Sequence, residues 1–390
     1  MSGANRRTIS IFGATGSVGT STLDLVRLER DKYRVLALTA YSNVEKLAEL
    51  ALEFEAEFAV VADHSKLAQL EQILDGTATR AFAGPDKLIE MATLGADWTM
   101  AAIVGCAGLA PVLEALKCGK TVALANKEAL VSAGALMMTE ASAAGATLLP
   151  VDSEHNAIFQ CLQGGRIDQV RKITLTASGG PFRTWTREQM ASVTPAQAVA
   201  HPNWDMGAKI SVDSATMMNK GLELIEAHYL FPVGLENIEI IVHPQSVIHS
   251  MVEYRDHSTL AQLGAPDMRI PIASALAWPE RMATGCKSLD LATIGKLDFE
   301  APDIERFPAL KLAREAIEQG GAAPAVLNAA NEVAVAAFLE GSVQFLEITE
   351  IVSRVLGGYR PPEPKALADI FMIDKEARKQ AESLVEDMKI

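Results

Sequence analysis

Four polar residues that could hold a cation follow an apolar run at residues 147–151: Asp152, Ser153, Glu154 and His155. The run has the composition of a buried parallel strand, and ligands of such sheets collect at the carboxyl ends of the strands. If the chain stays extended here, Asp152 and Glu154 point to the same side, about 6–7 Å apart. Two such carboxylates could converge on one hard divalent cation. An alternative stays open, because Asp-Ser-Glu is also typical of a helix N-cap and a solvated first turn.

A glycine-rich loop follows the first β-like run, residues 8–12. It reads Gly-Ala-Thr-Gly-Ser-Val-Gly at positions 13–19 and leads into a helical pattern. Strand, glycine turn and helix together let the backbone approach a phosphate, which the helix N-terminus attracts. The spacing is GxxGxxG rather than GxGxxG, so the interpretation rests on the position of the loop after the first strand.

The end of the second β-like run, residues 33–40, indicates which dinucleotide binds. An NAD site usually places an acid there for the ribose 2′-hydroxyl. This chain instead has Tyr41, Ser42 and Asn43, which present small donors and no carboxylate to repel a 2′-phosphate. We therefore predict NADP, with Ser42 and Asn43 near the phosphate.

Further β-like runs alternate with helical segments, which predicts a largely parallel sheet and an α/β fold. These runs lie at residues 58–62, 79–83, 100–104, 121–125 and 147–151. Asn126, Lys127 and Glu128 follow one of them, so Lys127 is expected to face a ligand. We predict a Rossmann-like NADP-binding domain over residues 1–150, an α+β catalytic domain that binds metal and substrate over 151–277, a connector over 278–308 and a C-terminal α-helical domain over 309–390.

The middle of the chain holds a second group of polar residues. A β-like run at residues 173–177 ends in Ser178-Gly179-Gly180, which could form an anion-binding turn or an ordinary hairpin turn. If residues 219–223 are helical, Asn219 and Lys220 share a face with Glu223. Glu223 could then be a third metal ligand and Lys220 a phosphate contact, although a Lys–Glu pair at this spacing is most often a surface ion pair.

Composition excludes several classes of protein. The chain has 390 residues, 49% of them apolar, and a net charge of −14. This length predicts two or three domains, and the charge argues against nucleic acid or an anionic membrane as a partner. We expect neither a signal peptide nor a membrane span. The four cysteines show no paired spacing, which is typical of reduced thiols in the cytoplasm, and no Cys/His pattern indicates zinc.

Seven motifs, in order along essentially the whole chain, resemble the 1-deoxy-D-xylulose 5-phosphate reductoisomerase family. They are Gly-Ala-Thr-Gly-Ser-Val-Gly at 13–19, Leu-Ala-Asn-Lys-Glu at 124–128, Pro-Val-Asp-Ser-Glu-His-Asn at 150–156, Ser-Gly-Gly-Pro-Phe at 178–182, His-Pro-Asn-Trp at 201–204, Ser-Val-Asp-Ser-Ala-Thr-Met-Met-Asn-Lys-Gly-Leu-Glu at 211–223 and His-Pro-Gln-Ser at 243–246. The resemblance implies conversion of 1-deoxy-D-xylulose 5-phosphate, with NADPH and Mg²⁺ or Mn²⁺, to 2-C-methyl-D-erythritol 4-phosphate in non-mevalonate isoprenoid synthesis. It also implies a homodimer, with residues 151–277 as the dimerisation domain.

The resemblance also implies roles for individual residues. Metal ligands would be Asp152, Glu154 and Glu223. Substrate contacts would be Ser153, Glu154, Ser178, His201, Ser214, Asn219, Lys220 and Glu223, with Lys127 as the active-site lysine, so that Lys127, Glu154 and His201 are the catalytic candidates. NADPH contacts would be Thr15, Gly16, Ser17, Val18, Asn43, Asn126, Glu128 and Gly207. One departure stands out: relatives often place a glycine and a lysine or arginine where this chain has Tyr41 and Ser42, which weakens the expected 2′-phosphate contact.

Residues 190–207 are expected to form a mobile lid over bound substrate. Thr194-Pro195 and His201-Pro202 favour irregular, extended backbone, and Trp204 could cover the carbon skeleton of the substrate. The alternative is a purely structural role, in which Trp204 is a core residue under an ordinary loop.

Two other function classes stay open. One is another metal-dependent NADP oxidoreductase acting on a phosphorylated polyol, and the other is a non-catalytic dinucleotide-binding regulator.

Towards the C-terminus, helical patterns cover residues 310–319, 325–339, 348–356 and 375–388. The stretch 324–332 is polar enough to contact something, but core packing and capping explain it adequately.

Overall fold

The computed structural model describes residues 6–162, 166–200 and 207–389. Within them the chain forms two compact units. The first unit comprises the described residues of 1–129, 137–156 and 267–287, and the second comprises those of 130–136, 157–266 and 288–390. Among the described residues, no helix combines the length and the apolar character needed to cross a membrane.

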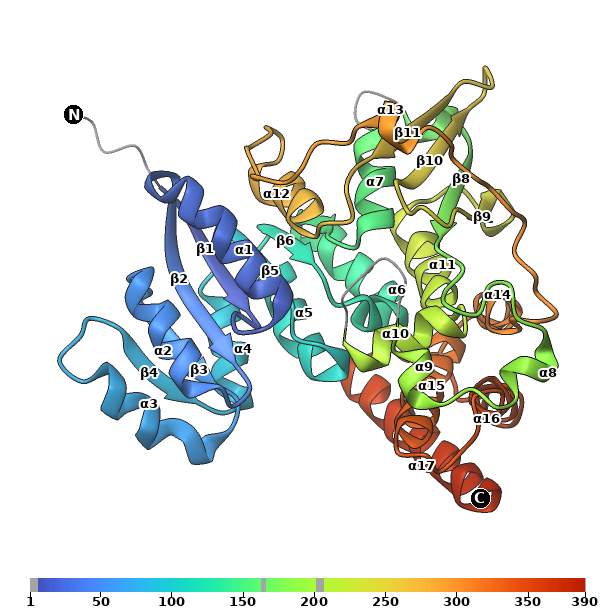
Figure 1. Ribbon diagram of the computed structural model, residues 1–390. Coiled ribbons are helices and arrows are strands. Elements are labelled where there is room, and N and C mark those ends of the chain that lie inside the picture. The colour runs from blue at the N-terminus through green and yellow to red at the C-terminus, as the bar shows by residue number, and fades with distance from the viewer. Residues whose placement is uncertain (1–5, 163–165, 201–206, 390) are drawn as a thin grey trace. The chain divides into compact units, whose positions relative to one another are not determined.

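The first unit is built on a seven-stranded parallel sheet in the order β4-β3-β2-β1-β5-β6-β7 (Figure 1). Its strands are β1 (Arg7–Phe12), β2 (Tyr33–Ala40), β3 (Phe58–Val61), β4 (Arg80–Ala83), β5 (Trp98–Ala101), β6 (Thr121–Leu124) and β7 (Thr147–Pro150). The expected Rossmann-like α/β sheet is confirmed. The strand order reverses between β1 and β5, and this switch point is where α/β sheets bind ligands. The strand expected over residues 100–104 lies earlier, at Trp98–Ala101, and a short 3₁₀ helix follows at Gly105–Gly108.

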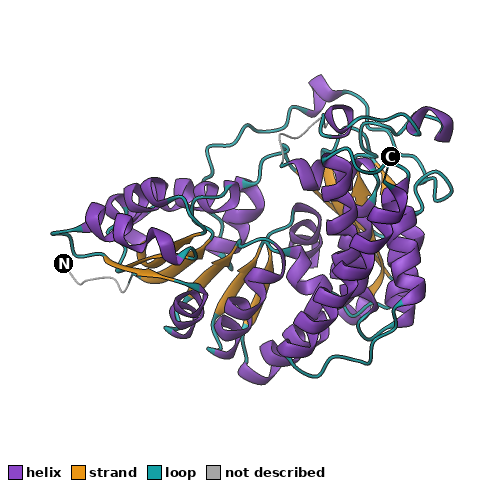
Figure 2. Cartoon of the chain, turned by 90° about the horizontal axis from the view of Figure 1, so that it is seen from below, coloured by secondary structure: helices purple, strands orange, loops and turns teal. Residues whose placement is uncertain are grey.

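Helices lie on both faces of this sheet (Figure 2). They are α1 (Ser17–Leu28), α2 (Val44–Glu53), α3 (Leu67–Leu74), α4 (Pro85–Thr93), α5 (Leu109–Lys117), α6 (Lys127–Ala144) and α12 (Arg269–Ala277). Helix α12 comes from far along the chain, yet the Trp98 Nε1 donates a hydrogen bond to the Ala275 carbonyl at 3.0 Å, and α12 packs on α1. No local sequence pattern indicated that this helix would join the first unit.

The second unit contains a four-stranded sheet in the order β11-β10-β8-β9. Its strands are β8 (Val170–Ala177), β9 (Ile238–Val242), β10 (Ile248–Tyr254) and β11 (Thr259–Leu263). β8 runs parallel to β9, and β10 is antiparallel to both β8 and β11. Helix α7 (Ser153–Leu162) precedes β8. The helices between β8 and β9 are α8 (Arg187–Met190), α9 (Pro195–Ala198), α10 (Ala208–Ala215) and α11 (Met218–Leu230). Helix α7 starts in the first unit and continues into the second.

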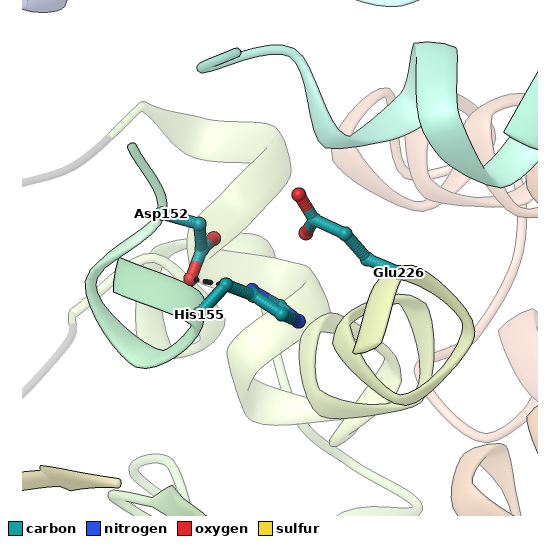
Figure 3. A group of neighbouring side chains, drawn as sticks. All are labelled: Asp152, His155 and Glu226. Carbon is teal, nitrogen blue, oxygen red and sulfur yellow. Dashed lines mark ion pairs between the residues drawn. The ribbon is translucent and has the colours of Figure 1, made fainter. Parts of the chain in front are cut away.

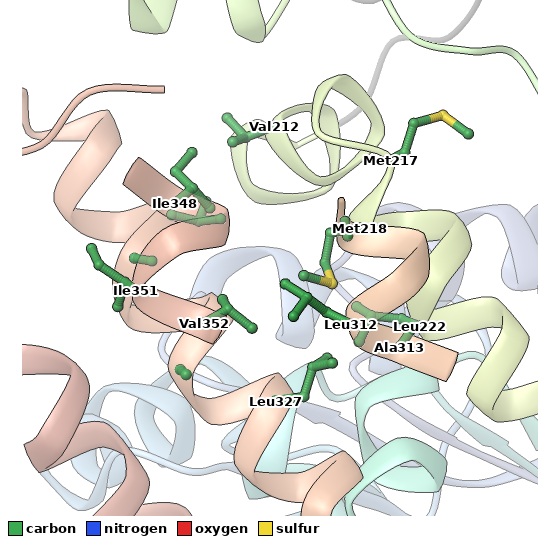
Figure 4. Packing of buried hydrophobic residues seen from close by; sticks show 14 of the residues in the cluster. Val212, Met217, Met218, Leu222, Leu312, Ala313, Leu327, Ile348, Ile351 and Val352 are labelled. Atoms are coloured by element: carbon green, nitrogen blue, oxygen red, sulfur yellow. The ribbon is translucent and has the colours of Figure 1, made fainter. Parts of the chain in front are cut away.

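Helices dominate the C-terminal part of the second unit, as expected. They are α14 (Ala309–Gln319), α15 (Ala323–Leu339), α16 (Glu347–Gly358) and α17 (Leu367–Met388), preceded by the short α13 (Leu291–Ile294). Helix α17 begins eight residues before the expected start at 375, because the Asp369 carboxylate caps its first turn by accepting from the backbone of residues 365 and 366. Figure 4 shows the apolar side chains of α14, α15 and α16 meeting those of α10 and α11 in one cluster.

The part of the expected lid that the structure describes is folded. Thr186 and Thr194 each form a capping box that starts a short helix, α8 or α9. Met190 and Ala198 are fully buried in the apolar cluster of the second unit. Residues 195–198 are therefore helical where irregular backbone was expected, while Thr194 is extended, as expected for a residue before proline. His201 and Trp204 lie outside the described residues.

Candidate active site

The glycine loop between β1 and α1 is too crowded for side chains at two positions. Gly13 has a φ of +90°, and a Cβ there would lie 2.6 Å from the Ala102 carbonyl oxygen at the end of β5. A Cβ at Gly19 would lie 2.3 Å from the Gly13 oxygen. Glycines thus let the N-terminus of α1 pack tightly onto the strand ends at the switch point.

The same loop leaves the start of α1 accessible. Gly16 is the N-cap of α1, and Gly16 and Ser17 are exposed, while Thr15 and Val18 are half-buried. No side chain caps this helix, so its first backbone N–H groups stay available to an anion.

The end of β2 carries no acid. Tyr41, Ser42 and Asn43 are all exposed, with Tyr41 at 77%. The Asn43 side chain accepts from the Lys46 backbone N–H at 3.2 Å and so caps α2. Ser42 and Asn43 are therefore held at the carboxyl end of β2, where a Rossmann fold places the adenosine ribose.

Asn126 has a structural role at the start of α6. Its side-chain oxygen accepts from the Ala129 N–H at 3.1 Å, and its nitrogen donates to the Gly105 carbonyl at 2.9 Å. The residue is 1% exposed and ties the β5–α5 loop to α6. These bonds position Lys127 and the half-buried Glu128, the first two residues of α6.

Lys127 and Asp152 form an ion pair at the carboxyl ends of β6 and β7. The Lys127 Nζ lies 2.6 Å from Asp152 Oδ2, and both side chains are largely buried. Burial opposes ionisation of Asp152, but the positive charge of Lys127, with a further contribution from His155, holds the pKa of this carboxyl well below its usual range. Figure 3 shows the pair formed by Asp152 and His155, in which the His155 Nδ1 lies 3.4 Å from Asp152 Oδ1. The figure also draws Glu226, a buried residue of α11.

The chain turns into a helix immediately after Asp152, so of the two alternatives it is the N-cap, and not the extended chain, that the structure shows. Asp152 Oδ1 accepts from the Glu154 N–H at 3.3 Å, as the N-cap alternative predicted. The Ser153 hydroxyl donates to Glu154 Oε2 at 2.5 Å. The helical turn still brings Asp152 and Glu154 together, since each offers a carboxylate oxygen within 4.8 Å of the other. Capping and metal binding are thus compatible, and an oxygen-only donor set with Asp152 ionised suits a hard divalent cation.

The second unit holds a buried charged pair on α11. Lys220 is ion-paired with Glu223, and the Asn219 side chain donates to the other Glu223 oxygen at 2.5 Å. Lys220 is 4% exposed and Glu223 is 1% exposed. The surface ion-pair alternative is therefore wrong, because both side chains are buried. Removing both charges from water also has a free-energy cost that a surface ion pair does not have.

The Ser178 turn lies against the end of α10. The Ser178 hydroxyl accepts from the Gly180 N–H at 3.1 Å, and a Cβ at Gly180 would lie 2.7 Å from the Ser214 carbonyl oxygen. The hairpin alternative is wrong, because the next strand, β9, runs parallel to β8. Met217, in the left-handed conformation with a φ of +62°, then turns the chain from α10 into α11.

Three adjoining segments of the second unit therefore carry its predicted site residues. Ser178, Ser214, Asn219 and Lys220 come from the β8 turn, α10 and α11, and Gly207 is the exposed N-cap of α10. A hydroxyl-rich, lysine-containing group of this kind suits a phosphate. Sequence reasoning did not find the contact between His155 and Asp152, since an i,i+3 His–Asp spacing is common in ordinary helices.

Comparison with known proteins identifies the family. Three family models match the chain: 1-deoxy-D-xylulose 5-phosphate reductoisomerase at residues 9–134, its C-terminal domain at 148–231, and a further DXP reductoisomerase C-terminal domain at 263–380. A reductoisomerase of this name from Zymomonas mobilis is 60% identical over 382 residues, 98% of each chain. The chain belongs to the 1-deoxy-D-xylulose 5-phosphate reductoisomerase family. It is therefore an enzyme, as the sequence motifs indicated.

Other relatives agree with this assignment. A 1-deoxy-D-xylulose 5-phosphate reductoisomerase from Rhodospirillum centenum is 56% identical over 97% of this chain and 94% of its own. The solved Zymomonas mobilis enzyme in complex with NADPH superposes with a TM-score of 0.95 at 59% identity, covering 98% of this chain and all of the other. A reductoisomerase solved with NADPH, fosmidomycin and magnesium has a TM-score of 0.91 at 45% identity, covering 97% and 98%. The fold is thus that of the family.

Proposed function

We propose that this chain catalyses the NADPH- and divalent-metal-dependent conversion of 1-deoxy-D-xylulose 5-phosphate to 2-C-methyl-D-erythritol 4-phosphate, a step of non-mevalonate isoprenoid synthesis. The observation that carries the proposal is the group formed by the buried Lys127 and the half-buried Asp152 and Glu154 at the carboxyl ends of β6 and β7. In a parallel sheet these ends share one edge with the glycine loop that follows β1. Relatives solved with NADPH and with magnesium support both ligands.

NADPH would bind along this edge of the first unit. The exposed start of α1 would receive the pyrophosphate, with Thr15, Gly16, Ser17 and Val18 around it. Ser42 and Asn43 would approach the 2′-phosphate. Asn126, Glu128 and Gly207 complete the proposed NADPH contacts, Asn126 acting through the position of the α6 N-terminus.

The cation would be Mg²⁺ or Mn²⁺, held by Asp152, Glu154 and Glu223. The two carboxylates of the first unit lie within 4.8 Å of each other, and Glu223 is a buried carboxylate on α11. When bound, the cation polarises the substrate oxygens, and the nicotinamide supplies the hydride that reduces the rearranged aldehyde.

The residues of this chain would position the substrate and compensate its changing charge. Lys127 is the first residue of α6, and its ammonium group would stabilise negative charge that develops on a substrate oxygen. Ser153 and Glu154 would hold the substrate hydroxyl groups at the start of α7. Ser178, Ser214, Asn219 and Lys220 would bind the phosphate, whose binding energy orients the distant reacting carbons. His201 and Trp204 are proposed to contact the substrate as well.

We also propose a homodimer in the cytoplasm and the domain boundaries 1–150, 151–277, 278–308 and 309–390. Cys118, Cys161 and Cys286 are free thiols in the structure, which suits a reducing compartment. Light scattering of the purified chain at several concentrations would measure the oligomeric state.

Incubation of the chain with 1-deoxy-D-xylulose 5-phosphate, NADPH and Mg²⁺ tests the function. Absorbance of the reduced nicotinamide should fall, and the product should be the branched polyol phosphate by NMR. Omitting the substrate and adding a chelator are the controls. Turnover of another phosphorylated polyol but not of this substrate would favour the alternative oxidoreductase, and NADPH binding without turnover of either would favour the regulator.

A further inference from the structure

A buried hydrogen bond links the C-terminal helices to the segment that carries the proposed phosphate site. The Asn331 side chain on α15 donates to Asp213 Oδ1 on α10 at 2.8 Å. Asn331 is fully buried and Asp213 is 1% exposed. The second Asp213 oxygen pairs with Lys209 one turn earlier on α10, at 2.9 Å.

This bond matters because a buried carboxylate needs a donor at each oxygen. The Asp213 carboxylate lies in a region that α10 shares with the apolar side chains of the C-terminal helices, where Val212 points into the cluster of Figure 4. A charge placed there without hydrogen bonds is strongly unfavourable. Asn331 therefore stabilises one orientation of α10. It disfavours rotations of α10 that would break the hydrogen bond between the Asn331 side-chain amide and the Asp213 carboxylate.

The orientation of α10 decides where the neighbouring site residue lies. Ser214 directly follows Asp213, and its carbonyl packs against Gly180 of the Ser178 turn. At the end of α10, the Thr216 hydroxyl donates to backbone carbonyls of α10 and accepts from the Met218 N–H at 3.3 Å, which ties α10 to the start of α11. A shift of α10 would thus move Ser214 relative to both the turn and α11.

We infer that Asn331 is a positioning residue for substrate binding: through Asp213 it fixes α10 and hence Ser214 at the phosphate. The inference rests on the proposed function, since it takes the phosphate site from there. It assigns a role to the polar stretch 324–332 and to the C-terminal helices, which otherwise contribute only packing.

Asn328 provides a matched control on the same helix. It is also a fully buried asparagine of α15, and its side-chain oxygen, like that of Asn331, has no hydrogen-bond partner in the described structure. Its nitrogen, however, donates to Glu332 within α15 at 3.1 Å rather than to α10. Truncating either residue removes similar volume and one hydrogen bond, but only Asn331→Ala releases α10.

The test compares Asn331→Ala, Asn328→Ala, Ser214→Ala and the Asn331→Ala/Ser214→Ala double variant in steady-state kinetics. We expect Asn331→Ala to lower kcat/KM for 1-deoxy-D-xylulose 5-phosphate about tenfold, as for other small displacements of a binding group. The KM for NADPH should stay within about twofold of the unmodified chain. The double variant should be little worse than Ser214→Ala, because residues that act through one another are not additive. Asn328→Ala should leave kcat/KM near that of the unmodified chain.

A second pair of variants covers the case in which Asn331→Ala does not fold. Asn331→Asp places two carboxylates next to each other, which is unfavourable. Adding Asp213→Asn restores the hydrogen bond, with the amide at position 213 as donor and the carboxylate at position 331 as acceptor. Recovery of kcat/KM in that double variant supports the inference. Equal losses in Asn328→Ala and Asn331→Ala, or additive losses with Ser214→Ala, would overturn it and leave Asn331 as packing. If Ser214→Ala itself has no effect, the phosphate assignment fails as well, which distinguishes the two failures.

Discussion

Gly19→Ala adds one methyl group at the most crowded point of the glycine loop, and we expect it to weaken NADPH binding. The new Cβ would lie 2.3 Å from the Gly13 oxygen, 2.6 Å from the Ala14 Cα and 2.7 Å from the Ala14 carbonyl carbon. Non-bonded carbon contacts are favourable only near about 3.5–4.0 Å, so the start of α1 must move by about 1 Å. All three neighbours are backbone atoms, and no side chain can rotate away.

The size of the effect follows from this strain. Overpacking of this kind costs about 1–3 kcal/mol. If the strain is relieved by moving α1 away from the pyrophosphate, the Kd for NADPH should rise about five- to 150-fold. If it stays in the loop, the same free energy appears as a lower Tm. Fluorescence titration with NADPH and thermal unfolding without it measure the two parts.

Gly357→Ala is the control. Gly357 is also a helical glycine, in α16, and a Cβ there would meet no atom within 4 Å. Alanine at such a position should leave NADPH binding unchanged and raise stability by up to about 1 kcal/mol. An unaltered Kd for NADPH together with an unaltered Tm in Gly19→Ala would refute the argument that this loop requires glycine.

Three further outcomes follow from the site. Glu154→Gln keeps the side-chain size but removes a charge from the proposed oxygen-only metal site. The Mg²⁺ concentration for half-maximal activity should therefore rise at least about tenfold, while NADPH still binds. Unchanged activity at low Mg²⁺ would contradict the assignment of Glu154 as a metal ligand. Lys127→Met should lower kcat by about 100-fold or more with little change in Kd for NADPH, because Lys127 would stabilise charge in the transition state; an effect on KM alone would make it a binding residue. Ser42→Asp should erode the NADPH preference by placing a carboxylate at the end of β2, and equal kcat/KM for NADPH and NADH in the unmodified chain would show that Tyr41 and Ser42 had already removed it.

Much of the first unit could be predicted from sequence alone, since its signals are local. A buried parallel strand needs a short apolar β-rich run, and the second strand was predicted with the bounds found, residues 33–40. The glycine loop at 13–19 was recognisable because glycine is required there by backbone contacts with residues close in sequence and at the next strand end. Helix α12 could not be assigned in this way, because it joins the first unit through contacts with residues about 180 positions away.

The site divides along the same line. Sequence motifs determined the family, the reaction class and the residue types able to hold NADPH, a hard cation and a phosphate. Only the tertiary structure decided that Asp152 is paired with Lys127 and held ionised, and that Lys220 and Glu223 are buried rather than a surface pair. The same is true of Asn331. Core packing and capping explained its polar stretch from sequence, and only the structure shows its hydrogen bond from α15 to Asp213 on α10. Burial and pairing between distant segments set the charge state and orientation of a side chain, and neither is encoded in the spacing of residues along one segment.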